Sequence, residues 1–196
     1  KVVLSLDCDF IGSEAAASRL IRGFTRGRRL EKPTDSMNRL YAVEGLMTLT
    51  GMNADHRLRV ATGHVVAVAA AIAAQIAPQN AQIAALVVKA PLPASVKPEW
   101  VTECAKDLQA NPGASLVLAG HRQPPAVHIL ANLLNAALGN VGKTVQYATV
   151  PETPTNADLA GLAALLNAGQ IDTLIILGGN PAYNAPAELN WAAAQA

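Results

Sequence analysis

Three stretches of the chain share one order of hydrophobic and polar positions. Val2–Leu6, residues 115–120 and residues 174–177 are short apolar runs, and each leads into a polar or glycine-containing turn and then a helix-forming segment. Strands that are apolar on both faces are typical of parallel sheets with helices on both sides. The repeat therefore predicts an α/β fold with a mostly parallel sheet, Rossmann-like αβα layers and strand-end turns that gather along one edge.

Helix and strand signals between these runs predict the rest of the first half. Residues 14–28 are expected to form a helix with Ser13 as its N-cap, and residues 39–43 are expected to form a second strand. Residues 46–60 are expected to be an irregular loop over the sheet. An alanine-rich helix then runs to about Ile76.

The second half is less regular. Residues 83–88 fit either a short strand or the end of the preceding helical layer, and the pattern does not decide between them. Pro98 suits the first turn of a helix, and Gly139 is expected to be the left-handed cap of a later one. After a proline-containing connection at residues 151–155, a last helix ends at Gly169 and leads into the third apolar run.

We expect residues 1–196 to be one αβα domain that is a fragment of a larger multidomain protein, since the chain opens directly on a strand without a methionine. The proline-rich loop at residues 89–98 is a candidate sub-boundary. Residues 65–74 form the longest apolar run, which has ten residues. A membrane-spanning helix needs about 20, so this run is expected to be a core helix.

Composition narrows the classes of partner. A formal net charge of +1 with only 15% charged residues argues against nucleic acid. The basic run at residues 22–29 is better explained as a solvated helix face than as a phosphate-binding patch. The two cysteines, Cys8 and Cys104, are expected to be buried thiols. They cannot by themselves form a zinc site or a cysteine-ligated iron–sulfur cluster.

Two glycine turns supply the candidate cofactor-binding residues. These residues are Gly178, Gly179 and Asn180 after the third apolar run, and Gly139, Asn140 and Gly142 after the helix that precedes them. Glycine lets a ligand approach the backbone, and helix amino termini favour phosphate. The alternative is that these residues only cap helices and form tight turns. Neither a GxGxxG nor a GxxxxGK[ST] motif is present, so no standard nucleotide site is supported.

No side chain gives a clear catalytic signal. Asp7 and Asp9 could bind a metal or a ribose hydroxyl, but capping of the next helix is the favoured interpretation. Asp55, His56 and Arg57 could be an acid/base group. Adjacent residues rarely face one another, so a surface ion cluster is the better explanation. Neither catalytic nor metal-binding residues are predicted.

The order of several motifs resembles the molybdopterin oxidoreductase family. The stretches that carry the resemblance are residues 54–64, residues 133–143 and residues 176–181, which ends in Gly178-Gly179-Asn180-Pro181. The resemblance implies αβα lobes that hold a bis-molybdopterin guanine dinucleotide cofactor in active members of the family. The six glycine-turn residues would then line the dinucleotide site.

A more specific similarity points to one branch of that family. Residues 37–44, 54–58 and 120–128 are similar to the large iron–sulfur subunits of alternative complex III, which are quinol oxidoreductase subunits. This resemblance implies a domain without its own molybdenum cofactor, joined to a ferredoxin-like domain that carries iron–sulfur clusters. It also implies integral-membrane quinol-oxidising and cytochrome c partners, and a location at the periplasmic face of the membrane.

Departures from the family pattern favour a scaffolding role. Active members usually have Asp-Pro-Arg and Gly-Thr-Asp where this chain has Val43-Glu44-Gly45 and Thr62-Gly63-His64. These changes remove an arginine suited to phosphate and a carboxylate suited to guanine. The alternatives are the cofactor-binding portion of an active enzyme, or an unrelated nucleotide- or phosphate-binding module.

Overall fold

The structure is a computed structural model that describes residues 1–149 and 158–195. The chain divides into two compact units, Lys1–Tyr147 and Ala148–Ala196, which are considered separately below. The loop at residues 89–98 lies inside the first unit, and the connection expected at residues 151–155 falls outside the described residues. No helix in the described part of the chain is both long and apolar enough to cross a membrane.

The first unit contains a four-stranded parallel sheet in the order β3-β2-β1-β4. Its strands are β1 (Val2–Leu6), β2 (Arg39–Glu44), β3 (His56–Arg59) and β4 (Ser115–Ala119). Leu4 in β1 lies opposite Tyr41 in β2 and Val117 in β4. The predicted parallel, Rossmann-like α/β fold is therefore confirmed.

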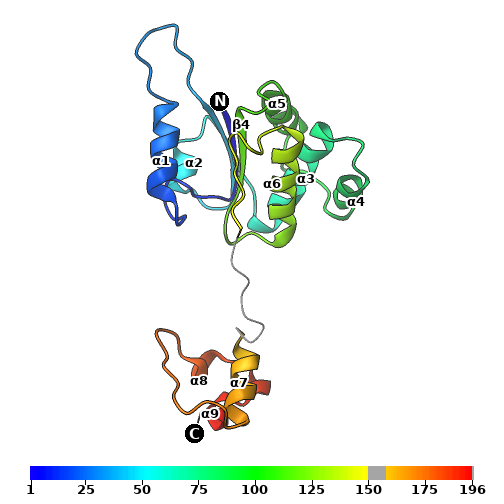
Figure 1. The fold of residues 1–196 in the computed structure, drawn as a ribbon. Coiled ribbons are helices and arrows are strands. Elements are labelled where there is room, and N and C mark those ends of the chain that lie inside the picture. The colour runs from blue at the N-terminus through cyan, green and yellow to red at the C-terminus, as the bar shows by residue number, and fades with distance from the viewer. Residues whose placement is uncertain (150–157, 196) are drawn as a thin grey trace. The chain divides into compact units, whose positions relative to one another are not determined.

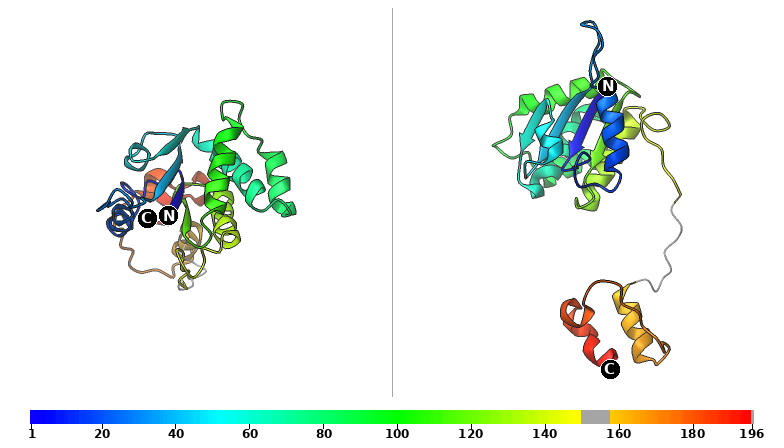
Figure 2. Two further views of the ribbon diagram at one scale, coloured as in Figure 1. Left: turned by 90° about the horizontal axis from the view of Figure 1, so that it is seen from above. Right: turned by 90° about the vertical axis from the view of Figure 1, so that its left-hand side faces the viewer.

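Helices cover both faces of this sheet (Figures 1 and 2). The helices of the first unit are α1 (Ala17–Arg26), α2 (Leu49–Met52), α3 (Val65–Ile76), α4 (Ala81–Lys89), α5 (Pro98–Gln109) and α6 (Pro125–Ala137), with a 3-10 turn, η1 (Thr62–His64), before α3. α1 lies on one face, and α3, α5 and α6 lie on the other. β1 is thus sandwiched at the centre of an αβα arrangement.

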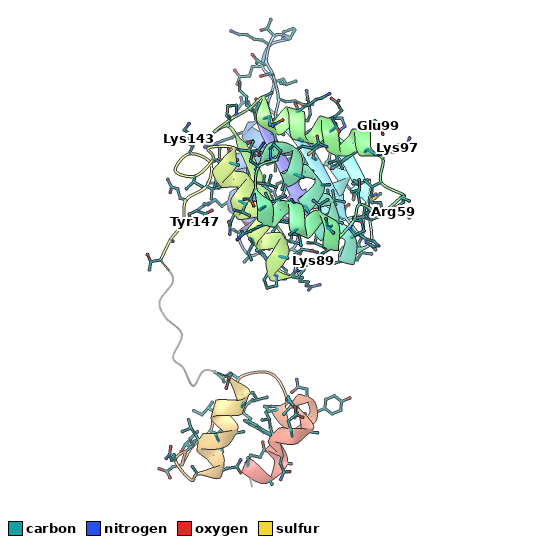
Figure 3. All side chains as sticks on the ribbon, turned by 90° about the vertical axis from the view of Figure 1, so that its right-hand side faces the viewer. Arg59, Lys89, Lys97, Glu99, Lys143 and Tyr147 are labelled. Atoms are coloured by element: carbon teal, nitrogen blue, oxygen red, sulfur yellow. The ribbon has the colours of Figure 1, made fainter. Side chains whose placement is uncertain are left out.

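The larger core lies between the sheet and α3, α5 and α6. Val65, Val68 and Ile72 of α3 are fully buried at helical spacing. Burial of each such side chain stabilises the fold by roughly 1.5–3 kcal/mol. Charged residues such as Lys89 and Glu99 stay exposed at the rim of this helical layer (Figure 3).

The smaller core lies under α1. Phe10 and Phe24 meet edge to face, with ring centroids 5.5 Å apart, and Leu40 of β2 packs with them. Leu118 of β4 reaches the same cluster but is only partly buried. This face of the sheet therefore has less cover than the opposite face.

Several local expectations are confirmed. β1, β2, β4 and the alanine-rich helix α3 lie where the pattern predicted, and Pro98 occupies the first turn of α5. Gly139 adopts the left-handed conformation, with φ 65°, immediately after Leu138, the C-cap residue of α6. Residues 83–88 belong to α4, which settles that alternative in favour of a helix.

The expected N-cap at Ser13 is wrong. α1 begins only at Ala17, and its N-cap residue, Ala16, makes no side-chain hydrogen bond. The reason lies in Asp9, whose Oδ2 accepts from the Ser13 backbone N–H at 3.0 Å. That bond holds residues 9–13 in a turn and so delays the start of the helix.

The expectation of an irregular loop at residues 46–60 is also wrong. This segment contains α2 and β3, and β3 pairs in parallel with β2, with His56 opposite Tyr41. The strand lacks a run of apolar residues. Backbone hydrogen bonds to β2 and side-chain bonds to neighbouring elements hold it in place instead.

The second unit contains only short helices among its described residues. They are α7 (Leu159–Asn167), α8 (Pro181–Asn184), η2 (Ala187–Leu189) and α9 (Trp191–Ala194). The prediction of a buried strand at residues 174–177 is wrong, since this segment has no strand hydrogen bonding and Leu177 is 92% exposed. A strand needs a partner backbone, and residues 158–195 contain no other strand to provide one.

Candidate functional site at the carboxyl edge of the sheet

Parallel α/β sheets usually bind ligands where neighbouring strands connect in opposite directions, outside their carboxyl ends. In this sheet that point lies between β1 and β4, because β1 is followed in the chain by β2 on its other side. The residues that follow the two strands are Asp7 and Gly120. The candidate site is therefore the crevice between these two strand ends.

The side chain of Asp7 bridges the two sides of this crevice. Its Oδ2 accepts a 2.7 Å hydrogen bond from Gln123 Nε2 in the turn before α6, and its backbone N–H donates to Val43 O at 2.7 Å. Asp7 has a φ of 52°, a left-handed conformation that is strained for a residue with a side chain. The strain indicates that surrounding contacts fix this residue in position.

Gly120 brings the opposite wall directly against Asp7. A Cβ atom at Gly120 would lie 1.9 Å from the Asp7 carbonyl oxygen, so only glycine fits there. The Gly120 backbone N–H also donates to Leu6 O at 3.0 Å. The two backbones therefore touch where a ligand would otherwise enter.

A second contact bridges the same crevice. Glu14, in the turn after β1, accepts from the His121 backbone N–H at 3.2 Å, and its Oε2 lies 3.1 Å from His121 Nδ1. Gln123 is only 5% exposed, and its Oε1 has no hydrogen-bond partner among the described residues. The crevice is thus filled by protein groups from both sides.

Asp9 has a structural role at this edge. Its Oδ1 accepts from Thr50 N and Thr50 Oγ1 at 3.0 and 2.9 Å, in addition to the bond from Ser13. Burial alone would raise the pKa of Asp9, but these hydrogen bonds outweigh it and lower the pKa. Asp9 therefore does not cap α1, as the favoured interpretation had it, but holds the turn after β1 and ties that turn to Thr50 in α2.

Glu44 places another carboxylate near the strand ends. It is 3% exposed, pairs with Arg57 Nε at 2.6 Å and accepts from Thr48 Oγ1 at 2.6 Å. The described residues contain no group of three or more His, Cys, Asp or Glu side chains arranged to hold a metal ion. Asp7 and Glu14 place two carboxylates at the crevice itself, and these oppose the binding of phosphate there.

The cluster at residues 55–57 separates into three contacts. Asp55 pairs with Arg28, Arg57 pairs with Glu44, and the His56 ring stacks on Tyr41 with centroids 4.6 Å apart. None of the three side chains faces its neighbour in sequence. The three residues therefore form neither an acid/base group nor the single surface ion cluster that was expected, because each contacts a different partner.

Both cysteines are free and buried, as expected. Burial is the main reason that the pKa of the Cys8 thiol rises to about 12, and nearby carboxylates, Glu14 first among them, add to the effect. Burial also raises the pKa of Cys104. Neither thiol has the thiolate character that a nucleophile requires.

Three of the six predicted cofactor-binding residues lie in the first unit, and the other three lie in the second. Gly139, Asn140 and Gly142 follow α6, and the Gly113 N–H donates to Leu138 O beside them, so they lie near the amino end of β4. They are therefore at the edge opposite to the candidate site.

Asn140 is fully buried and bonded within the fold. It accepts from Ser115 Oγ at 3.1 Å and donates to Asn135 Oδ1 at 3.0 Å.

Gly178, Gly179 and Asn180 belong to the second unit, where both glycines are left-handed, with φ 82° and 86°. A Cβ atom added at either glycine would meet nothing within 4 Å, so the space beside both backbones is open.

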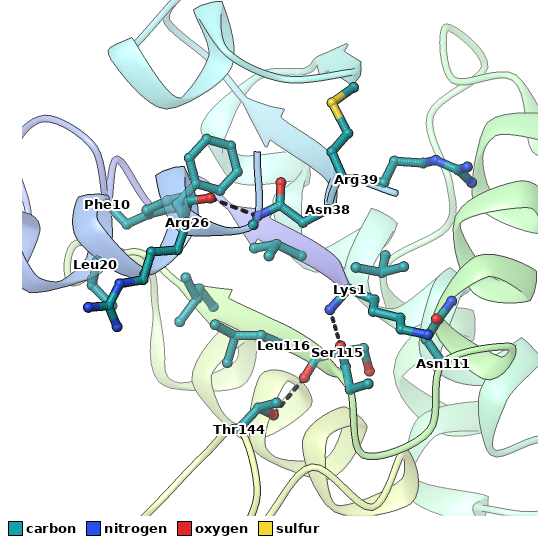
Figure 4. A pocket seen from close by; sticks show the side chains of 18 of the residues that line it. Lys1, Phe10, Leu20, Arg26, Asn38, Arg39, Asn111, Ser115, Leu116 and Thr144 are labelled. Atoms are coloured by element: carbon teal, nitrogen blue, oxygen red, sulfur yellow. Dashed lines mark hydrogen bonds between the residues drawn. The ribbon is translucent and has the colours of Figure 1, made fainter. Parts of the chain in front are cut away.

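A large cavity occupies the amino edge of the sheet instead. It measures about 910 Å³ and lies between α1 and the starts of β1, β2 and β4 (Figure 4). Arg19, Arg22 and Arg26 of α1 line it. The last two belong to the basic run at residues 22–29, for which a solvated helix face was the favoured interpretation over a phosphate-binding patch. The signal that could have found this lining is the spacing of the three arginines, since residues three and seven positions apart share a helix face.

No protein-family model matches the chain, and no curated protein matches it either.

Proposed function

We propose that this chain is a structural αβα domain of a larger redox protein, which packs against other domains and holds no molybdenum cofactor of its own. The motif resemblance to the large iron–sulfur subunits of alternative complex III motivates the proposal. The observation that carries it is the Asp7–Gln123 hydrogen bond across the crevice between β1 and β4. A domain that bound a dinucleotide at this point would need that crevice open.

Charge supports the same conclusion. A pterin dinucleotide carries phosphates, and the strand ends present Asp7, Glu14 and Glu44 in their place. Arg57, the cation nearest to Glu44, is engaged by that carboxylate at 2.6 Å. The residues at this edge therefore do not fit the cofactor.

The proposal implies a set of partners and a location. These are a ferredoxin-like domain with iron–sulfur clusters in the same polypeptide, integral-membrane quinol-oxidising and cytochrome c subunits, and the periplasmic face of the membrane. Nucleic acid is not among them. The domain itself would supply packing surface, while electron transfer takes place in other parts of the parent protein.

Metal analysis and pterin fluorescence of the full-length natural protein test this proposal. We expect iron but neither molybdenum nor tungsten in stoichiometric amounts, and no pterin released on denaturation. Stoichiometric molybdenum or tungsten would overturn the proposal. Calorimetry of this chain with guanosine diphosphate supplies a second test, in which saturable heat would contradict it.

A second candidate is the cofactor-binding portion of an active enzyme. It is favoured by the left-handed, open backbone at Gly178 and Gly179, which a ligand could approach closely. If this candidate is correct, the natural protein contains pterin, and Gly179→Ala lowers its pterin content. A protein without pterin rules this candidate out.

A further inference from the structure

The sheet face under α1 is only partly covered. Val3 of β1 and Leu116 and Leu118 of β4 point to this face and are half-buried, whereas Val2 and Val117, on the opposite face, are fully buried. Parallel sheets normally have helices on both faces along their whole width. Within the first unit, α1 and the residues packed with it leave a groove beside β4 open.

The wall of this groove is a row of arginines. Arg19, Arg22 and Arg26 are exposed and stand at i, i+3 and i+7 on α1, so they extend along about 10.5 Å of the helix. None of the three makes an ion pair in the described part of the chain. The row therefore offers positive charge that is not neutralised within the unit.

The groove contains little negative charge of its own. Asp107 is the carboxylate that lines it, and this group accepts from Tyr41 Oη at 2.8 Å and pairs with Arg39. Arg26 lies in the last turn of α1, where it also complements the helix dipole. Arg19 and Arg22 lie further from the helix end, so the dipole does not explain them.

The apolar sheet face is the floor of the groove, and the arginine row is its wall. Together they define the chemistry of a molecule that could bind there. Leu20 and Leu116 face the groove from opposite sides, and Arg26 stands beside Leu20 at its rim (Figure 4). An occupant that fits needs an apolar side for the floor and a row of negative charges for α1. A helix with carboxylates at i, i+3 and i+7 has both, because its charges repeat with the same spacing as the arginines.

We propose that this groove docks an acidic amphipathic helix of a partner protein, which lies beside α1 and completes the helical layer over β1 and β4. Its apolar face covers Val3, Leu116 and Leu118. Its carboxylates pair with Arg19, Arg22 and Arg26. The inference stands on this groove alone and does not depend on the redox role proposed above.

Synthetic peptides test the docking. The probe is a fluorescein-labelled 18-residue helix, in round numbers five turns long, with leucines on one face and glutamates at i, i+3 and i+7 beside them. Two matched peptides carry glutamine or lysine in place of glutamate. Fluorescence anisotropy with the full 196-residue chain measures the affinity of each.

We expect the glutamate peptide to bind about tenfold more tightly than the glutamine peptide, because three exposed ion pairs each add a modest amount. The triple variant Arg19→Glu, Arg22→Glu, Arg26→Glu should no longer bind the glutamate peptide and should bind the lysine peptide instead. Arg29→Glu is the matched control. Arg29 pairs with Glu31 beyond the end of α1 and does not line the groove, so this change should leave peptide binding unaltered.

The charge-swap design keeps the test decisive if the triple variant is less stable, since regained binding of the lysine peptide requires a folded groove. Equal binding of the glutamate and lysine peptides would overturn the proposal, as would an unchanged affinity in the triple variant. Dodecyl phosphate is a further probe. If it binds saturably while the glutamate peptide does not, the groove is a small-anion site and the helix assignment fails.

Discussion

The side-chain amide of Asn135 makes both hydrogen bonds that a neighbouring strand would make with Val117. The Val117 backbone N–H donates to Asn135 Oδ1 at 3.0 Å, and Asn135 Nδ2 donates to Val117 O at 2.8 Å. β4 pairs with β1 on its other side, so this amide closes the outer edge of the sheet at the middle of β4. An unpaired edge at that point would be a template for association with another chain.

Asn135→Leu should therefore destabilise the first unit by roughly 2–4 kcal/mol, because it leaves two buried backbone groups without partners. Urea unfolding measures this change. The fluorescence of Trp100 should be followed in a Trp191→Phe background, so that the signal comes from the first unit.

Asn132→Ala is the control for this prediction. Asn132 lies on the same helix, and its side chain accepts only from the exposed Tyr147 hydroxyl at 3.2 Å. We expect a change within about 0.5 kcal/mol. Equal effects of the two substitutions would mean that the bonds to Val117 contribute nothing specific.

Gly120→Ala should open the crevice between β1 and β4. The new methyl group would lie 1.9 Å from the Asp7 carbonyl, so the turn must move, at a cost of about 3 kcal/mol. Because Cys8 lies against the same glycine, its thiol should react with Ellman's reagent at pH 8 at least about tenfold faster than in the unmodified chain. Cys104, which is fully buried in α5, should stay unreactive until global unfolding.

Gly63→Ala is the matched control for Gly120→Ala. An added Cβ at Gly63 meets nothing within 4 Å and the backbone is not left-handed, so the change should be neutral or slightly stabilising. Mass spectrometry of the labelled protein identifies which thiol has reacted. Labelling of Cys104 before Cys8 would show that the crevice is not the weak point.

A strand that contains an apolar run can be predicted from this sequence. A strand that is recognisable only by its hydrogen bonds to a neighbouring strand cannot. β1 and β4 each have four apolar residues and one serine and lie next to turn formers, so the pattern alone finds them. β3 consists of His56, Arg57, Leu58 and Arg59, and it is a strand because β2 supplies its hydrogen bonds. Residues 174–177 show the reverse, since an apolar run without a partner backbone does not become a strand.

The candidate site was even less accessible to sequence reasoning. The bond from the Ser13 N–H to Asp9 was within reach of local sequence reasoning because the two residues are close in sequence, but the bonds from Thr50, 41 positions away, were not, so the predicted helix cap was wrong. Asp7 and Gln123 are 116 positions apart, so no local pattern could reveal that they close the crevice. Contacts between distant residues appear only once the strand order is known.

Arg57→Met should destabilise the first unit by about 3 kcal/mol, because it leaves the buried Glu44 carboxylate without its cation. The double variant Glu44→Gln, Arg57→Met should recover part of this loss, since it removes the uncompensated charge. Urea unfolding of these two variants and of Glu44→Gln alone measures the coupling.

Arg29→Met is the control, because the Arg29–Glu31 pair is exposed and should contribute less than about 0.5 kcal/mol. Additive effects of Glu44→Gln and Arg57→Met would contradict a specific ion pair.

Asp55 should make the stability of the first unit depend on pH in the acid range. Burial alone would raise the pKa of Asp55, but hydrogen bonds from Arg28 and from the Leu40 N–H, the latter at 2.8 Å, outweigh it and hold the pKa below its usual value of about 4. A carboxylate whose pKa is lower in the folded state stabilises the protein above its unfolded pKa. That stability is lost as the pH falls through the folded pKa.

Asp55→Asn should therefore reduce the free energy of unfolding by roughly 1–2 kcal/mol at pH 7 and flatten its decline below about pH 4. Urea unfolding at a series of pH values from neutral to acid measures both effects. Glu103→Gln is the control, because Glu103 is 64% exposed and pairs only with Lys106 one helical turn away, so its profile should match that of the unmodified chain. If Asp55→Asn also keeps the original slope below pH 4, the acid dependence arises from other carboxylates, of which Asp9 is the next to test because its pKa is lowered as well.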